Sequence, residues 1–393
     1  MAFLAVPGAI SSSPSSEAPP DVFGGGPPLA RFRYGRLTIS RRTFRLMIAA
    51  MMVAWLPLFL LVALQSLVAG DGSLHSFLTD YGVMARTLIA VPVLILAQAV
   101  AAPRLDAIAR YFRGAGLVRG AEVVRFDEIV RSTCRLRDSM GVEIVIVIAA
   151  IALSAAFWTV PSSLPPWHRA GAVPSAATWW HEFVSLPILL LLLLGWFWRL
   201  TLWTRFLFQV SRLDLLLIPS HPDGAGGLKF LGLSLEALVL PAFALSTAVA
   251  GPIANQVFHL GAPVMSFRAP VVVFAGLVVA LLAGPLLLFS EKLLTTMRQG
   301  MLDYGALARD LGVRMENRWL HKPVADEALG APDFSATTDL YAVVANVYSM
   351  NIVPLSLRNL VLIAVAILLP FAPIELFAVS PIELLKKLTG LLL

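Results

Sequence analysis

The chain has few charged residues and a single cysteine. Only 14% of its 393 residues are Asp, Glu, Lys or Arg, whereas a soluble domain carries roughly 25%. Because 58% of the residues are hydrophobic, the composition argues against a soluble enzyme and is typical of a membrane protein. Cys134 is the only cysteine, so no disulfide bond can form within the chain.

Motifs of the common enzyme classes are also absent. The sequence has no Walker loop, no H-E-x-x-H, no G-x-S-x-G and no C-x-x-C. The run Gly224–Gly227 lacks the spacing of a dinucleotide-binding fingerprint. We therefore expect no cofactor. We also expect no nucleic-acid partner, because membrane topology and lipid contact account for the basic residues.

Long apolar runs predict an all-α, polytopic membrane helix bundle with about seven spans. Each run holds about 20 residues, enough to cross a hydrocarbon core of about 30 Å. The predicted spans are residues 46–68, 83–102, 142–160, 182–203, 233–257, 269–289 and 357–379.

Four segments of the chain differ in composition. Residues 11–28 are rich in Ser, Pro and Gly and are predicted to be disordered. The predicted segments are a basic N-terminal part (1–45), a six-span core (46–289) with polar loops at 103–141 and 205–232, a polar helical segment (290–356), and a last span with an amphipathic tail (357–393).

Basic residues gather on one side of this predicted topology. With a cytoplasmic N-terminus, the cytoplasmic tail and loops hold 23 of the 30 Lys and Arg residues. The opposite loops hold only Arg169 and Arg268. The positive-inside rule therefore places the N-terminus and both large loops in the cytoplasm. The arginines between residues 31 and 45 are expected to contact the lipid bilayer surface.

The loop Ser220–Leu228, which we call the focal loop, is polar and rich in glycine between two apolar runs. Its glycines allow positive φ and close backbone approach, and their N–H groups could bind an ion or small anion. His221 and Asp223 could do acid–base work or bind a metal. The alternative is a rigid turn in which Asp223 accepts backbone N–H bonds. The glycines concerned are Gly224, Gly226 and Gly227.

Three ionisable residues lie near the predicted cytoplasmic ends of the spans: Glu143, Arg199 and Glu236. A charge at the centre of a membrane helix costs roughly 2.5–3.5 kcal/mol, so such residues are functional candidates. We expect them to form one cluster with His221 and Asp223. The alternative is that each side chain separately reaches the lipid headgroups.

Histidines and kinked helices offer further candidates. Four of the six histidines fall on the predicted outer side, but no spacing resembles a zinc motif, so a metal stays unassigned. Gly251-Pro252 and Gly284-Pro285 are predicted to kink the fifth and sixth spans and to free backbone carbonyls. The four histidines are His75, His168, His181 and His259.

A heptad pattern follows the sixth span and predicts one long helix projecting from it. A shorter apolar seam in residues 123–133 precedes the third span, and we expect the two seams to pack together or to join subunits in a homo-oligomer. Residues 333–350 are predicted to form another amphipathic helix beneath the membrane. The heptad positions are Leu294, Met297, Met301, Tyr304, Ala308, Leu311 and Met315.

The focal loop, S-H-P-D-G-A-G-G-L, resembles a loop found in uncharacterised bacterial multi-pass inner-membrane proteins. The segments Asp339–Tyr341 and Val347–Pro354 are similar to the same group. The resemblance implies a bacterial inner-membrane protein. It brings no established activity with it, so no catalytic role is assigned.

Three functions agree with these patterns. The first is a transporter- or channel-like protein with its ion site at the cytoplasmic boundary, formed by the focal loop with Arg199 and Glu236 as coupled charges. The second is a membrane scaffold or signalling component that binds a partner through the heptad helices. The third is a lipid-modifying enzyme that uses His221 and Asp223. A transporter requires a polar path through the spans, and a scaffold requires an exposed apolar seam in the cytoplasm. A lipid-modifying enzyme requires a lipid-sized groove that opens onto His221.

Overall fold

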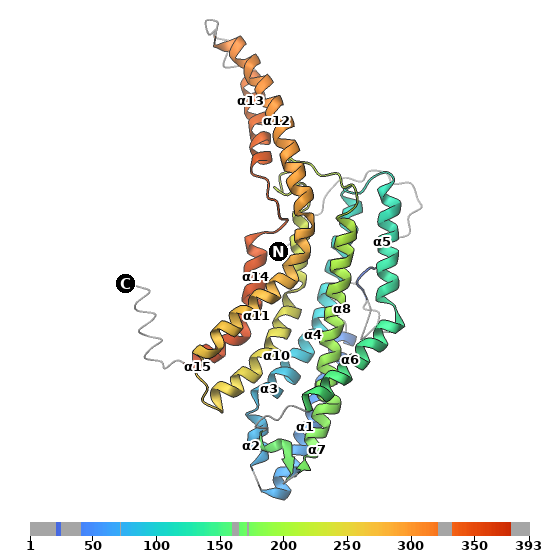
Figure 1. Cartoon of the computed structure of the whole chain (residues 1–393), viewed down its shortest axis with the longest axis vertical. Coiled ribbons are helices and arrows are strands. Elements are labelled where there is room, and N and C mark those ends of the chain that lie inside the picture. The colour runs from blue at the N-terminus through green and yellow to red at the C-terminus, as the bar shows by residue number, and fades with distance from the viewer. Residues whose placement is uncertain are drawn as a thin grey trace, which may run out of the picture.

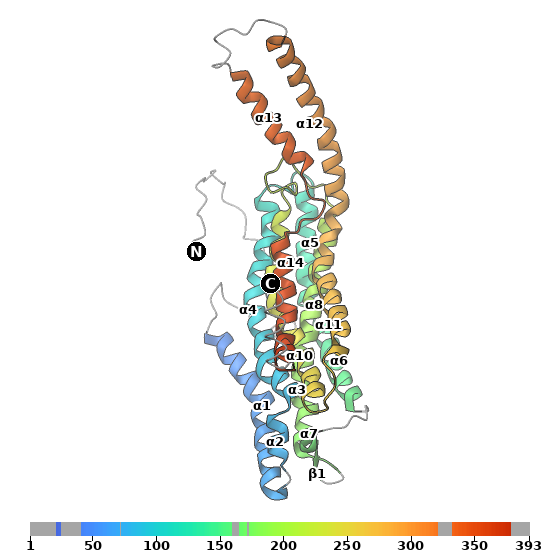
Figure 2. The same cartoon turned by 90° about the vertical axis from the view of Figure 1, so that its left-hand side faces the viewer.

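The computed structural model describes residues 21–24, 41–70, 72–158, 165–170, 173–320 and 332–378. They form an elongated helical bundle from which a two-helix arm projects (Figures 1 and 2). We call the end of the bundle that carries the arm the arm end, and the opposite end the far end. The fold is all-α. The strands among the described residues are β1 (Arg169–Ala170) and β2 (Val173–Pro174), an antiparallel pair at the far end.

The chain passes back and forth along the bundle. The first half comprises α1 (Arg41–Ala69), α2 (Ser73–Leu78), α3 (Tyr81–Met84), α4 (Val91–Gly114), α5 (Glu122–Arg137), α6 (Met140–Trp158), α7 (Ala176–Trp180) and α8 (Leu186–Val210). The second half comprises α9 (Leu233–Ala237), α10 (Val239–Phe258), α11 (Met265–Ala283), α12 (Ser290–Trp319), α13 (Pro332–Tyr348), α14 (Leu357–Leu368) and α15 (Ala372–Ala378). Short 3-10 segments join several of them: η2 (Pro166–His168), η4 (Lys229–Gly232), η5 (Gly284–Phe289) and η7 (Leu369–Phe371).

Five continuous helices of the described chain are long and apolar enough to cross a membrane, and two bent pairs bring the total to as many as seven. The bent pairs are α5 with α6, at 45°, and the segment from η4 through α9 with α10, at 41°. This confirms the polytopic helix bundle. Among the five continuous spans, those that contain α4 and α8 have the largest buried share. In each of them 44% of the most apolar stretch is buried inside the bundle, whereas the share for α1 is 17%. Helices α4 and α8 are therefore central, and α1 faces its surroundings.

Prolines within the spans leave backbone carbonyls without a helical N–H donor, and side chains from neighbouring helices donate to these carbonyls instead. Pro57 has no N–H group for the Val53 carbonyl, and Trp180 Nε1 donates to that oxygen at 3.1 Å. Pro252 likewise leaves the Ala248 carbonyl, to which Arg86 Nε donates at 3.4 Å. The predicted release of a carbonyl at Gly251-Pro252 is confirmed, and an arginine is its partner.

The arm consists of α12 and α13 side by side (Figures 1 and 2). Helix α12 continues from α11 through η5, so the predicted long helix is confirmed. The heptad residues are half-buried, and most other positions of α12 beyond Gly300 are exposed. The main partner of this seam is α13, whereas α5 packs against α8. The expected pairing of the two seams within the chain is therefore wrong. The helix predicted over residues 333–350 is observed as α13, which packs along α12.

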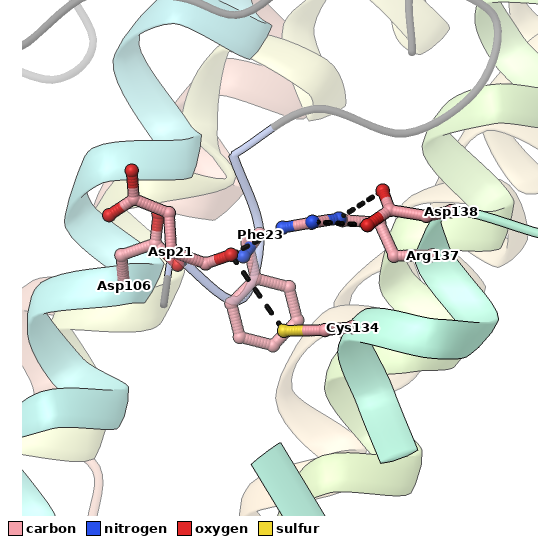
Figure 3. A network of polar contacts seen from close by, with 6 residues as sticks. All are labelled: Asp21, Phe23, Asp106, Cys134, Arg137 and Asp138. Atoms are coloured by element: carbon pink, nitrogen blue, oxygen red, sulfur yellow. Dashed lines mark hydrogen bonds and ion pairs between the residues drawn. The ribbon is translucent and has the colours of Figure 1, made fainter. Parts of the chain in front are cut away.

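A short piece of the N-terminal part, Asp21–Gly24, lies between α4, α5 and α8 (Figure 3). Phe23 is 1% exposed and meets the ring of Trp203 edge-on at 5.3 Å. Its N–H group donates to Asp106 Oδ1 at 2.7 Å, and Arg137 donates to the Asp21 carbonyl. The composition predicts disorder for residues 11–28. This prediction is wrong for residues 21–24, because the ring of Phe23 is buried against aromatic side chains of α8.

Helices α3 and α10 approach closely at Gly251. A Cβ atom at this position would lie 2.7 Å from the Tyr81 carbonyl oxygen and 3.0 Å from Gly82 Cα. Gly276, on α11, has nothing within 4 Å of the same added atom. We predict that Gly251→Ala lowers stability by about 1–3 kcal/mol through overpacking. Gly276→Ala should be neutral or stabilising, because alanine favours the helix.

Thermal unfolding of the two variants in the same detergent measures this difference. Equal unfolding midpoints for Gly251→Ala and Gly276→Ala would show that the α3–α10 contact is looser than the structure describes.

Candidate functional site

The focal loop folds around the carboxylate of Asp223. Asp223 Oδ1 accepts the N–H groups of Ala225 at 2.8 Å and Gly227 at 3.1 Å, and Oδ2 accepts that of Lys229 at 3.1 Å. The loop glycines adopt positive φ, as the sequence predicts, and the φ of Gly227 is 95°. Aspartate closes this turn because its short side chain can reach several amides at once.

His221 completes the loop. Its Nδ1 atom lies 2.8 Å from Asp223 Oδ1, and its carbonyl accepts the Gly224 N–H at 3.0 Å. Burial tends to raise the pKa of Asp223, but the backbone N–H groups and His221 outweigh it and hold the pKa below its usual value. The N–H groups of Gly224 and Gly227 are thus bonded within the loop, so they do not form an open anion site.

The focal loop also joins the bundle to the base of the arm. Ser220 Oγ lies 3.0 Å from Tyr304 Oη on α12, and Asn351, after α13, donates its N–H to the Gly224 carbonyl at 2.7 Å. A side chain at Gly300 of α12 would overlap the ring of Pro219. The geometry therefore favours the rigid-turn interpretation, in which the loop anchors the arm.

We predict that Asp223→Asn lowers stability at neutral pH by about 2 kcal/mol, since charge-assisted hydrogen bonds are lost. The wild-type stabilisation should be complete above the unfolded pKa of the carboxyl. It should disappear as the pH falls through the lower folded pKa. Asp214, exposed in the same connection, gives the matched control Asp214→Asn.

Thermal unfolding against pH tests this prediction. A stability difference between wild type and Asp223→Asn that does not shrink under acid conditions would contradict it.

The other predicted charges are not drawn together by the contacts described. Arg199 is 4% exposed, and its guanidinium lies 5.4 Å from the ring centroid of Trp196. Glu236 is half-buried, and its backbone carbonyl accepts a bond from Arg104 at 3.4 Å. Glu143 is half-buried in the first turn of α6. Within the described chain, neither Glu143 nor Glu236 forms an ion pair.

A second group of polar residues lies deep in the bundle, towards the far end. We call it the Arg86 cluster: Asp80, Arg86, His168, His181 and Glu182. Its anchor is Asp80, which is 5% exposed and accepts bonds from Asn255 Nδ2 at 2.8 Å and Trp167 Nε1 at 3.1 Å. Asp80 and Glu182 are the carboxylates whose charges act on Arg86.

Two π-helical segments carry the cluster. Arg86 lies in η1 (Ala85–Ala90), and His181 and Glu182 lie in η3 (His181–Ser185). Such segments add a residue to one helical turn and often occur at functional sites. Both His181 Nδ1 and Glu182 Oε2 are buried without a hydrogen-bond partner in the structure. Polar atoms of this kind are costly, so they mark a site where water or a ligand is expected.

The histidines of the cluster are close together but not arranged as a metal site. The rings of His168 and His181 have their centroids 6.1 Å apart. Burial lowers the pKa of His168 to about 4, so this imidazole is neutral near pH 7. Across the described ranges, no three His, Cys, Asp or Glu residues are grouped to hold a metal ion. The cluster can exchange protons and bind small ions through its charges.

Glu182 also faces a side cavity of about 350 Å³ between α6 and the start of α8. Ser154 lies in its wall, and its Oγ donates to the Glu182 carbonyl. Trp179 and Phe183 stack at 5.3 Å on the same cavity. Glu182 is thus part of the wall of this cavity, although its Oε2 atom is itself buried.

The sequence alone indicates some residues of the Arg86 cluster but not their grouping. Arg86 opens the second predicted span, and Asp80 and His181 lie next to predicted spans. Each residue by itself resembles an ordinary interfacial group. The pairing of Asp80 with Asn255 joins residues 175 positions apart, which no local pattern indicates.

Comparison with known proteins adds no further assignment. No family model, no curated protein and no solved structure matches the chain.

Proposed function

We propose that the protein is transporter-like and moves protons or another small ion across a membrane through the Arg86 cluster. The observation that carries this proposal is an arginine inside a membrane-spanning helix beside buried, unpartnered atoms of His181 and Glu182. An ionisable residue within a membrane-spanning segment is costly unless it is compensated, so it is expected to serve a function.

The residues divide into anchoring and exchanging groups. Asp80 holds its oxygen atoms in bonds to Val83, Asn255 and Trp167, and it fixes the base of the cluster. Arg86 donates to the Ala248 carbonyl, which has no helical N–H partner because of Pro252. Glu182 keeps one free oxygen and faces the side cavity. We therefore assign Glu182 as the proton-carrying group and Arg86 as the charge that tunes it.

The interior towards the arm end supports transport by conformational change rather than an open pore. Between α4, α8, α10 and α11 the described chain leaves an apolar space of only about 40 Å³, lined by residues such as Leu94, Trp196 and Leu245. The π-helical segments at the cluster interrupt the regular helical hydrogen-bond pattern and supply places where spans can bend. The cluster would open to one side at a time.

We also propose a bacterial inner-membrane location with the arm end in the cytoplasm. The supporting observation is the excess of Lys and Arg in the N-terminal tail and in the loops assigned to that side, 23 of 30. The expected ion site at the focal loop is replaced in this proposal by the Arg86 cluster, because the N–H groups of Gly224 and Gly227 are already bonded within the loop.

A scaffold role is the second candidate, favoured by exposed apolar side chains on the arm. Leu302 is 70% exposed and Tyr348 is 55% exposed. A second copy of the chain could cover them and form a homo-oligomer. This candidate requires that Leu302→Ser abolishes self-association, measured by light scattering in detergent, while ion flux is kept.

Proton flux into liposomes loaded with a pH-sensitive dye tests the transport proposal. Liposomes that contain the wild type should dissipate an imposed pH gradient faster than empty vesicles. The measurement is repeated with a sodium, a potassium and a chloride gradient to test whether another small ion moves with the proton. Glu182→Gln keeps the side-chain shape but cannot carry the proton, so it should lose this excess flux roughly tenfold or more. Glu143→Gln, on a half-buried carboxylate outside the cluster, is the matched control and should keep it.

Flux of the wild type at the level of empty vesicles under every gradient would overturn transport. Equal flux in Glu182→Gln and Glu143→Gln would overturn the assignment of the site.

A further inference from the structure

A groove between α5 and the end of α8 is unusually rich in arginine. It has a volume of about 900 Å³ and lies at the arm end of the bundle. Four arginines line it and Glu128 is the only acidic residue in its wall. These arginines are Arg125, Arg131 and Arg135 on α5 and Arg212 just beyond α8.

Several nearby carboxylates already form ion pairs, one of them with the groove residue Arg125. Asp127 pairs with Arg113 at 3.1 Å, Asp138 with Arg137, and Glu122 with Arg125. Within the part of the chain that the structure describes, Arg131, Arg135 and Arg212 have no carboxylate within ion-pair distance. The groove therefore collects positive charge that the protein itself does not neutralise.

Part of the groove is held in place. Arg212 lies with its guanidinium 5.0 Å from the ring centroid of Phe208, which fixes its direction. Arg205, next to the groove, donates from Nη2 to Ser132 Oγ at 2.9 Å. Its Nη1 atom and the Oε1 atom of Gln209, which lines the groove, are buried without partners in the structure. Arg205 Nη1 is a donor that an acceptor oxygen of a ligand would satisfy, whereas Gln209 Oε1 is an acceptor and needs a donor group.

The groove also lies at the right depth for a membrane surface. Helix α5 ends at Arg137, and the apolar α6 begins at Met140. The last turns of α5 are thus close to the point where the chain enters the apolar layer. Basic pockets between helices at this level bind phosphate-bearing headgroups, and the guanidinium fork matches phosphate oxygens.

We propose that the groove between α5 and α8 is a binding site for a phosphate-bearing ligand, held by Arg131, Arg135 and Arg212. The phosphate group belongs either to an anionic lipid or to a soluble phosphorylated molecule. The site is separate from the Arg86 cluster, so it does not depend on the proposed transport.

The test uses the full chain in nanodiscs of phosphatidylcholine. In one arm, phosphatidylglycerol replaces part of the lipid; in the other, inorganic pyrophosphate is titrated into the buffer. Thermal unfolding reports stabilisation, and native mass spectrometry reports bound lipid. The variant Arg131→Gln/Arg135→Gln/Arg212→Gln changes exposed side chains, so the fold should persist. The variant Arg298→Gln/Arg309→Gln/Arg314→Gln removes the same charge from exposed positions of α12 and is the control.

We expect at least roughly tenfold weaker retention of the phosphate ligand in the groove variant, and none of this loss in the control. Stabilisation by phosphatidylglycerol alone supports the site with a lipid as its ligand, and stabilisation by pyrophosphate alone supports it with a soluble one. Stabilisation by both supports a site open to either. Equal behaviour of the two variants, or no stabilisation of the wild type in either arm, overturns the proposal.

Discussion

Inside a bilayer, every backbone N–H and C=O group needs a partner within the protein, and this constraint organises the contacts between the spans. Pro57 and Pro252 each leave a carbonyl without its helical N–H donor, and Trp180 and Arg86 supply the missing hydrogen bonds. The two π-helical segments lie beside these contacts and also change the hydrogen-bond pattern. Each carbonyl without a helical partner therefore needs a donor from a neighbouring helix. At Pro252 this donor is the charged side chain of Arg86.

The arm end shows how a polar loop can serve the fold instead of a ligand. Asp223 uses its two oxygens on the loop's own amides, so the loop is rigid before it meets any other element. The loop then contacts α12 through Ser220 and the segment after α13 through Gly224. Through the focal loop the arm is connected directly to α8 and to the segment that leads into α9.

The two polar regions without an assigned ligand differ in electrostatic character. The Arg86 cluster mixes both signs of charge in the interior, where each charge is expensive and must be compensated. The arginine groove carries mainly positive charge at the surface, where an anionic ligand would supply the compensation. An apolar interior lined by Leu94 and Trp196 lies between α4, α8, α10 and α11. This difference is the basis for proposing small ions at the interior cluster and phosphates at the surface groove.

The sequence by itself determined the all-α class, the approximate number of spans, the long α12 and the carbonyl freed at Gly251-Pro252. These features follow from hydropathy, periodicity and proline geometry, which act within a few turns of one helix. Only the tertiary structure decided that α12 packs on α13, that Phe23 enters a pocket beside Trp203, and that Asp80 joins Asn255. The focal loop lies between these cases, since the sequence indicates both a rigid turn and an anion site, and the bonds to Asp223 favour the turn. Contacts between distant segments depend on which helices pack together and at what depth. The type of a residue does not indicate which distant residue it will contact.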